Sequence, residues 1–307
     1  MEESIEQTTP YKSGFVAIAG RPNVGKSTLI NTLMGQKIAA VTPRPQTTRR
    51  QQLGILTLEN AQIIFVDTPG LHRAHHKLGE WMNVEATHAF AHSDVLMIVV
   101  DGSQPVHEED HLVAKIILEQ AITLPQILII NKRDLIPPEN QLFVKVAFST
   151  LFPNATPVFI SAAKDENFEA LLSILTQHLP KGDPFFPEDQ VTDLYEREIA
   201  ADLIRESALL YLRDEVPHSI AIRMDEFTER GEMGAYIAAT LLVEKESHKP
   251  IVIGQGGEKI KQIGQAARQE IEKMSGRKVY LQLRVKVRPN WRNNEKVLQQ
   301  FGFRSHQ

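Results

Sequence analysis

The sequence contains no cysteine, which excludes disulfide bonds and thiolate metal ligands from its chemistry. It also lacks any apolar run close to the roughly 18 residues that a membrane span requires. Aromatic residues make up only 7% of the 307 residues, whereas apolar residues make up 42% and charged residues 23%. This length and composition are typical of a soluble globular chain with about two domains.

The net charge of −4 conceals a strong asymmetry along the chain. Residues 1–185 carry 15 Lys and Arg against 19 Asp and Glu, and residues 186–244 carry 5 against 14. Residues 245–307 carry 14 against 5. The basic final segment predicts a polyanionic partner, although basic side chains often only solvate a surface.

Residues 20–27 read Gly-Arg-Pro-Asn-Val-Gly-Lys-Ser and match the phosphate-binding pattern G-x-x-x-x-G-K-[ST]. An apolar strand is expected over residues 15–19 and a helix over residues 27–34. Strand, glycine-rich turn and helix form the context in which this pattern binds phosphate, because the backbone N–H groups and the helix N-terminus face the anion. Lys26 is expected at the terminal phosphates and the Ser27 hydroxyl at Mg²⁺.

Residues 38–50 contain two prolines, three arginines and three threonines without an apolar period, which indicates an exposed, mobile loop. At this distance from a phosphate loop, we interpret it as a switch segment in which one threonine completes the Mg²⁺ shell. A plain linker is the alternative.

A second apolar strand, residues 61–67, ends on Asp67 and is followed by Thr68-Pro69-Gly70. An aspartate at this position can hold the metal through water, and the Gly70 N–H can reach a γ-phosphate. Residues 71–77 then contain three histidines, which we interpret as a solvated loop rather than a metal site because no acidic residue accompanies them.

Two further predicted strands end in polar motifs. Residues 126–131 lead into Asn131-Lys132-Arg133-Asp134, an N-K-x-D motif whose carboxylate suits two N–H donors of guanine. Asn131 is expected near a ring oxygen or nitrogen, and the Lys132 stem over the purine face. A strand that ends near Ser161-Ala162-Ala163-Lys164 would bring the Ala162 N–H to the guanine O6.

Four motifs therefore occur in order at strand ends that alternate with helices, which predicts a parallel α/β sheet with its ligand loops at the carboxyl edge. A domain that binds guanine nucleotide with Mg²⁺ is the expected result.

The pattern changes after residue 187. An amphipathic helix (193–213) and two strands (219–227 and 235–243) precede Gly254-Gln255-Gly256-Gly257, a G-x-x-G turn that opens a basic helix. The KH module uses such a turn to clamp about four nucleotides of single strand. A purely structural helix–turn–helix is the alternative.

Together these motifs resemble the Era family of bacterial GTPases over residues 14–303. The segments that carry the resemblance are GRPNVGKST (20–28), PQTTRR (45–50), DTPGLH (67–72), NKRD (131–134), SAAK (161–164), FPED (186–189), VIGQGGEKIKQIG (252–264) and W-x-x-N-E (291–295). The sequence departs from the family in having NKRD where NKVD is common and in its histidine-rich second switch.

The resemblance implies an α/β fold, with a P-loop GTPase domain that has a parallel-rich sheet, plus a C-terminal α+β KH domain of type II. The implied domains are a disordered extension (1–13), a GTPase domain (14–182), a linker (183–191) and a KH RNA-binding domain (192–307).

The resemblance also implies GTP hydrolysis, with GTP or GDP, Mg²⁺ and possible K⁺ as ligands. Leu71 stands where many GTPases have a water-orienting Gln, and similar GTPases instead hold K⁺ through the residue equivalent to Asn23. Thr48 is our choice for the switch Mg²⁺ ligand, with Thr47 the alternative.

The expected metal ligands are Ser27, Thr48 and Asp67, and the expected catalytic residues are Lys26, Thr48, Gly70 and Asn23. The expected nucleotide contacts are Gly20, Arg21, Pro22, Asn23, Val24, Gly25, Lys26, Ser27, Thr28, Asp67, Thr68, Pro69, Gly70, Leu71, Asn131, Lys132, Asp134, Ser161, Ala162 and Ala163.

The implied partner is small-subunit ribosomal RNA near the 3′ end of 16S rRNA, in a monomeric factor that promotes 30S subunit maturation. A cytoplasmic location with peripheral inner-membrane association is implied as well. The expected RNA-binding residues are Ile253, Gly254, Gln255, Gly256, Gly257, Lys259, Lys261, Arg284, Lys286 and Arg288. Two hypotheses stay open: an enzyme whose GTP hydrolysis times RNA release, or an RNA-binding assembly chaperone in which GTP only selects a conformation.

Overall fold

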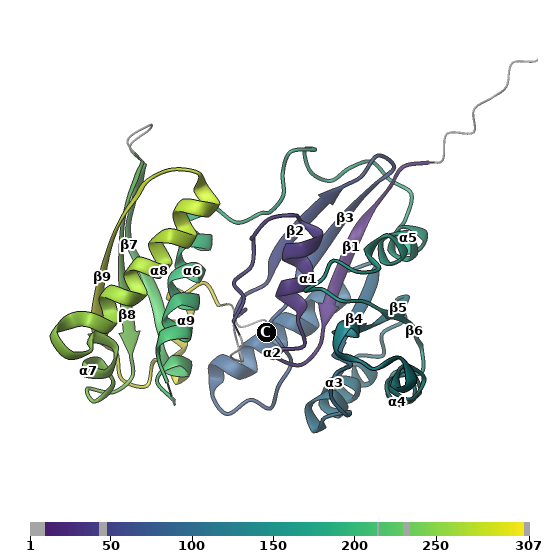
Figure 1. Ribbon diagram of the computed structural model, residues 1–307, viewed down its shortest axis with the longest axis horizontal. Coiled ribbons are helices and arrows are strands. Elements are labelled where there is room, and N and C mark those ends of the chain that lie inside the picture. The colour runs from purple at the N-terminus through teal and green to yellow at the C-terminus, as the bar shows by residue number, and fades with distance from the viewer. Residues whose placement is uncertain (1–9, 43–47, 214, 230–233, 304–307) are drawn as a thin grey trace, which may run out of the picture.

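The computed structural model describes residues 10–42, 48–213, 215–229 and 234–303. Figure 1 shows two bodies side by side, which we call the N-terminal body and the C-terminal body. The first is built on a six-stranded sheet and the second on a three-stranded sheet. No helix within the described ranges is both long and apolar enough to cross a membrane.

The six strands lie in the order β2-β3-β1-β4-β5-β6, and every pair is parallel except β2 with β3. Strands β3 and β4 are buried along their whole length, as expected for apolar runs at the centre of a parallel sheet. The strands are β1 (Lys12–Ala19), β2 (Gln52–Thr57), β3 (Ala61–Asp67), β4 (Val95–Asp101), β5 (Gln126–Asn131) and β6 (Ala155–Phe159).

Helices cover both faces of this sheet. Leu29 of α1 and Leu171 of α5 belong to one apolar cluster, and Phe90 of α2, Val113 of α3 and Phe148 of α4 belong to the other. The helices are α1 (Lys26–Leu33), α2 (Lys77–Ala91), α3 (Glu108–Glu119), α4 (Gln141–Leu151) and α5 (Phe168–His178). The predicted α/β class with a parallel-rich sheet is confirmed.

The structure differs from the sequence expectation at two edges of this body. Strand β2, which the sequence analysis did not identify, pairs antiparallel with β3 and extends the sheet. Strand β1 begins at Lys12, two residues before the predicted start of the GTPase domain at residue 14. The reason is that Lys12 N–H donates to Asn60 O and Ser13 N–H to Pro180 O, which extends the pairing. Residues 1–9 of that extension lie outside the described ranges.

In the C-terminal body the strand order is β7-β8-β9, with β7 antiparallel and β9 parallel to β8. Ile199 of α6 and Ile263 of α8 pack with one face of this sheet in a single apolar cluster. This is the arrangement of a type II KH domain. The elements are α6 (Glu196–Tyr211), β7 (Ala221–Glu229), β8 (Ala235–Val243), α7 (His248–Ile253), α8 (Glu258–Ser275), β9 (Val279–Val287) and α9 (Glu295–Gln300).

The segment that joins the two bodies is attached to the first one. The Gln62 side-chain oxygen accepts hydrogen bonds from the N–H groups of Phe185 and Phe186, and its amide donates to Phe186 O. Further along, Ile55 N–H donates to Val191 O. Within the proposed linker, residues 183–191, the backbone is therefore held against β2 and β3.

Trp291 is the centre of an apolar cluster that both bodies share. It is fully buried, and its indole N–H donates to Ser219 O at 2.7 Å. Leu78 and Met82 of α2 belong to the same cluster, together with Leu242 and Leu298 of the C-terminal body. Helix α2 thus packs directly against the C-terminal body.

The switch segment is less exposed than predicted. Ile38, Ala39 and Ala40 are buried, and so is Arg49, whose guanidinium donates to Ile220 O at 2.7 Å and to His218 O at 3.2 Å. The prediction of an exposed loop over residues 38–50 is wrong at these positions. Ile38 packs in the core of the N-terminal body, and the N–H groups of Ile38 and Ala39 donate to Asn31 Oδ1. Arg49 finds its acceptors in the C-terminal body, and a local sequence pattern reveals neither kind of contact. Residues 43–47 lie outside the described ranges.

We expect Trp291→Ala to lower the free energy of unfolding by about 3–5 kcal/mol, because it removes a large buried side chain and one hydrogen bond. Chemical denaturation followed by circular dichroism measures this. Leu118→Ala is the control, since Leu118 is 78% exposed and should change stability by less than about 0.5 kcal/mol. Equal midpoints for the two variants would contradict the central role of Trp291.

Candidate nucleotide site and RNA-facing turn

The phosphate loop lies between the end of β1 and the start of α1, and its glycines are required by close packing. Gly20 has φ of 147° and Gly25 has φ of 101°. A Cβ on Gly20 would lie 2.4 Å from Val99 O, and one on Gly25 would lie 2.3 Å from the Asn131 amide nitrogen. No larger residue fits either position, so this turn has the compact form that phosphate binding needs.

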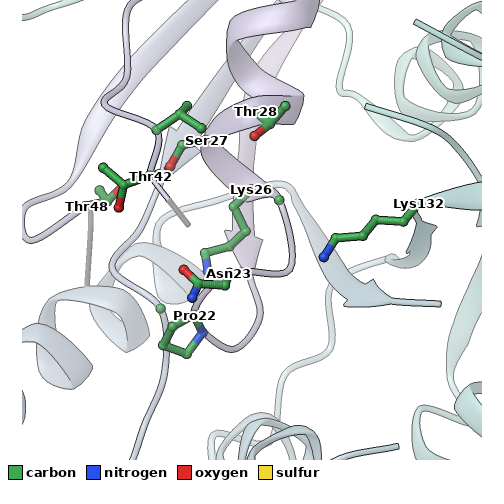
Figure 2. A pocket seen from close by; sticks show the side chains of 11 residues that line it. Pro22, Asn23, Lys26, Ser27, Thr28, Thr42, Thr48 and Lys132 are labelled. Atoms are coloured by element: carbon green, nitrogen blue, oxygen red, sulfur yellow. Dashed lines mark hydrogen bonds between the residues drawn. The ribbon is translucent and has the colours of Figure 1, made fainter. Parts of the chain in front are cut away.

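A cavity of about 390 Å³ opens above this loop. Figure 2 shows Lys26, Ser27 and Thr28 at the start of α1, Thr42 and Thr48 on one side and Lys132 on the other. Its lining also includes Pro22, Asn23 and Gly70, three residues that the sequence predicted. The sequence analysis did not single out Thr42 or Val41, which belong to the switch segment and line the cavity as well.

Lys26 lies within the phosphate loop itself. Its Nζ donates to Gly20 O at 3.0 Å and to Arg21 O at 2.9 Å. Burial lowers the pKa of Lys26 to about 8, although the Asp67 carboxylate acts in the opposite direction. A cation held by neutral carbonyls in this way remains attractive to an anion that enters the loop.

Three oxygen-bearing side chains converge beside Lys26. The Ser27 hydroxyl lies 2.9 Å from the Thr48 hydroxyl, and both donate to Asp67 Oδ2, at 3.3 and 3.1 Å. Burial raises the pKa of Asp67 to about 6, against the effect of Lys26 and of its hydrogen bonds. Asp67 Oδ1 is buried and has no hydrogen-bond partner within the described ranges.

This group of oxygens fits Mg²⁺, which prefers carboxylate, hydroxyl and water ligands. Ser27, Thr48 and Asp67 are the three residues that the sequence proposed as ligands, and the structure brings them together. The alternative ligand, Thr47, lies outside the described ranges.

The guanine-binding motifs are brought to the same edge of the sheet but are engaged with one another. The Asn131 amide donates to Val24 O at 2.9 Å, and its oxygen accepts from Ala162 N–H at 3.0 Å. Ser161 Oγ donates to Asp134 Oδ1 at 2.6 Å. Asn131 therefore connects the phosphate loop to the motif at residues 161–164. The Ala162 N–H, which the sequence analysis assigned to guanine O6, donates to Asn131.

Lys132 has φ of 62° and lies at the cavity wall, where its Nζ forms a 2.6 Å ion pair with Asp101. Burial alone would raise the pKa of Asp101, but hydrogen bonds from Lys132 and Ser103 lower it. The ion pair fixes the ammonium, so the stem of Lys132 is held at the wall of the cavity, as the purine-packing hypothesis requires.

The second switch begins in the protein core. Leu71 is fully buried, and its N–H donates to Gly20 O. A Cβ on Gly70 would lie 2.9 Å from Pro22 N, so the chain passes directly over the phosphate loop. His72 is buried, with Nδ1 2.8 Å from Gly70 O, which corrects the prediction of a fully solvated histidine loop. Among the described residues, no group of three or more His, Asp or Glu is placed to hold a metal.

The G-x-x-G turn has the backbone form that its glycines suggested. Gly254, Gly256 and Gly257 have φ of 74°, 59° and 81°. A Cβ on Gly254 would lie 2.6 Å from Lys259 Cβ, whereas one on Gly256 or Gly257 would meet nothing within 4 Å. Gly254 is thus required by packing, while the backbone at Gly256 and Gly257 faces open space.

Behind this turn a groove runs between α8 and β9. It is lined by Ile260, Lys261, Gly264, Gln265, Arg268, Leu281 and Leu283. Of these only Lys261 was among the predicted RNA-binding residues. The structure separates the predicted Arg284 and Lys286 from the groove, because they alternate along β9 with Leu281, Leu283 and Val285, which pack toward the helices. Arg288 follows the end of the strand and is exposed.

Known proteins match this chain over most of its length. Residues 15–132 match the family described as 50S ribosome-binding GTPase, and residues 215–292 match the KH domain family. GTPase Era of Ruminiclostridium cellulolyticum is 41% identical over 297 residues, which cover 96% of this chain and 99% of that protein. The chain belongs to the Era family of GTPases. GTPase Era of Clostridium botulinum is 42% identical over 296 residues with the same coverage.

Two solved Era structures are similar over 96% of this chain and their whole length. One, with MgGDPNP and nucleotides 1506–1542 of 16S ribosomal RNA, has a TM-score of 0.91 at 39% identity. The other, an Aquifex aeolicus Era variant bound to GDP and AlF4⁻, has a TM-score of 0.90 at 38% identity. The family assignment confirms the predicted GTPase activity.

We expect Lys26→Ala to weaken GTP binding at least about tenfold, because the variant loses the cation at the phosphate loop. Isothermal titration with GTP and Mg²⁺ measures the affinity, and thermal unfolding shows whether the loop still folds. Lys115→Ala, an exposed change on α3, is the matched control. A folded Lys26→Ala protein with normal GTP affinity would contradict the role of this lysine.

Proposed function

We propose that the C-terminal body binds single-stranded ribosomal RNA near the 3′ end of 16S rRNA, and that the protein thereby promotes 30S subunit maturation. The observation that carries the proposal is the pairing of an open glycine turn with a groove that has both apolar and basic walls. Leu281 and Leu283 supply the apolar wall and Lys261 and Arg268 the basic residues. This combination suits unstacked bases and the phosphates that connect them.

The related Era bound to nucleotides 1506–1542 of 16S rRNA supports this choice of RNA. Of the ten predicted RNA-binding residues, Ile253 to Gly257, Lys259 and Lys261 are assigned to the turn and groove. We add Gln265 and Arg268, which share the groove with Lys261. We also propose that GTP binding and hydrolysis control whether the protein binds RNA.

We expect Asp at both Gln255 and Gly256 to weaken the binding of a short single-stranded RNA by about two orders of magnitude. Two negative charges would then stand where the backbone approaches phosphate, and Gly256 has a positive φ that disfavours other residues. The measurement is a titration at fixed salt. GTP affinity of the same variant is the control, since the turn and the phosphate loop belong to different bodies. Unchanged RNA affinity in a variant that still binds GTP would refute the clamp.

In the N-terminal body, we propose that the residues of the phosphate loop, the three predicted metal ligands and Asp134 act as assigned. Lys26 and the N–H groups at the start of α1 hold the phosphates, and Ser27, Thr48 and Asp67 would hold Mg²⁺, which neutralises phosphate charge when bound. Asp134 is the acceptor for guanine N–H groups. Because the Leu71 side chain is buried in the core, this chain orients the attacking water without a side chain at that position.

We propose that Asn23, at the wall of the cavity, helps to hold K⁺ near the phosphates. Replacing K⁺ by Na⁺ should then slow GTP hydrolysis severalfold with little change in GTP affinity, because the smaller ion matches the same oxygen ligands poorly. Phosphate release in the two salts at equal ionic strength measures the effect. The same K⁺ dependence in Asn23→Ala as in the unchanged protein would exclude Asn23 as the ligand.

We further propose that the protein is a cytoplasmic monomer that associates peripherally with the inner face of the membrane. The supporting feature is an exposed apolar patch on α4, formed by Leu142, Phe143 and Val146. Sedimentation with anionic lipid vesicles tests the membrane part. Equal binding by the protein and by its Phe143→Ser variant would exclude this patch.

A further inference from the structure

The C-terminal sheet has two faces, and only one of them is covered by helices along its whole length. Residues 281, 283, 285 and 287 of β9 pack toward α6 and α8. The intervening residues Tyr280, Gln282, Arg284 and Lys286 therefore lie on the opposite face, which we call the outer face.

Among the residues that the structure describes, the outer face is covered at one end. Ala221 of β7 and Leu242 of β8 lie in the Trp291 cluster, where α2 and residues 291–303 pack on them. The remaining part includes Tyr236 of β8 and the β9 residues named above. Strand β9 is at the edge of the sheet, on the side farther from the N-terminal body in Figure 1.

Two tyrosines stand side by side on this open part. Tyr236 and Tyr280 are cross-strand neighbours, and their rings are stacked with centroids 5.7 Å apart and an interplanar angle of 15°. Tyr236 Oη donates to Gln282 Oε1 at 2.7 Å, which fixes the first ring. Tyr280 is 68% exposed although it is a large aromatic residue. Since β9 is the edge strand of the sheet within the described residues, we take the second face of the Tyr280 ring to be accessible to a flat ligand.

Arg284 and Lys286 continue the same row beyond the tyrosines, about 7 Å apart along the strand. Within the described ranges neither side chain forms a salt bridge. The nearest acid on β7, Asp225, is already occupied by hydrogen bonds from Thr240 at 2.6 Å and from Arg223 at 2.7 Å. The edge of the outer face therefore presents an aromatic ring followed by two cations.

We propose that the outer face of β9 is a second binding surface for single-stranded RNA, with a base stacked on Tyr280 and phosphates on Arg284 and Lys286. This inference rests on the proposed RNA-binding function. An aromatic ring with neighbouring cations is the pattern that holds a nucleic-acid strand without base-specific hydrogen bonds. Because Leu281 and Leu283 of the same edge strand line the groove on the other side, one RNA chain can leave the groove, pass around the edge and reach the outer face.

The test compares two oligoribonucleotides, one of about 5 nucleotides, which the groove alone can hold, and one of about 15 nucleotides. Tyr280→Ala should bind the short RNA normally and the long RNA about tenfold more weakly. The double variant Arg284→Ala/Lys286→Ala should also spare the short RNA, and it should reduce the slope of log affinity against log salt for the long RNA by about 1.4. Tyr280→Phe, which keeps the ring, should bind both RNAs normally.

The matched control is Lys115→Ala/Lys145→Ala, which removes two exposed cations from the N-terminal body and should leave both affinities unchanged. Normal binding of the long RNA by Tyr280→Ala and by the Arg284/Lys286 variant would overturn the inference. An equal loss in the Lys115/Lys145 control would also overturn it, because the effect would then be one of net charge.

The same experiment separates this inference from the proposed groove. If Gln255→Asp/Gly256→Asp keeps its affinity for the short RNA while the outer-face variants lose affinity for the long RNA, the groove assignment fails and the outer face is supported. If only the turn variant loses affinity, for both RNAs alike, the groove is supported and the outer face is not.

Discussion

Two consecutive residues of the switch segment connect the two bodies. The Thr48 hydroxyl contacts Ser27 and Asp67, whereas the Arg49 guanidinium is buried against Ile220 and His218 and lies 5.6 Å from the centre of the Trp291 ring. Burial lowers the pKa of Arg49, and the neighbouring Arg205 and Arg292 add to this effect. A buried guanidinium is costly unless its hydrogen bonds are kept, so separating the bodies would remove the two acceptors that compensate the burial of Arg49.

Consecutive Cα atoms are only about 3.8 Å apart, so a displacement of Thr48 must also displace Arg49 or strain the backbone between them. The second switch makes a parallel connection. It leads from Gly70 over the phosphate loop to α2, where Lys77 pairs with Glu295 and Leu78 packs in the Trp291 cluster. Both switches thus contact the same small part of the C-terminal body. A movement of the switches at the nucleotide site would therefore change the orientation of the RNA-binding surfaces.

The sequence predicted the elements that are determined by local pattern. The phosphate loop, Asp67 and N-K-x-D lie at strand ends because buried parallel strands are continuous apolar runs, and these runs were recognisable. Strand β2 was missed because its burial depends on pairing with β3 rather than on its own composition. The engagement of Asn131 with Val24 and Ala162 and the burial of Arg49 were missed for the same reason. Each joins residues far apart in the chain, and no spacing in the sequence encodes such a contact.

The charge of residues 245–307 shows that the sequence is limited in the same way when it is used to predict function. Two of its cations are already neutralised, since Arg292 pairs with Glu244 and Arg277 pairs with Glu196 and Glu229. A count of charges cannot separate these from Lys261, Arg268, Arg284 and Lys286, which face solvent in the groove or on the outer face. Lys261 and Arg268 of α8 line the groove, whereas strand alternation places Arg284 and Lys286 on the opposite side of β9. The basic segment is therefore better described as two narrow surfaces that meet at the edge of β9 than as one diffuse positive patch.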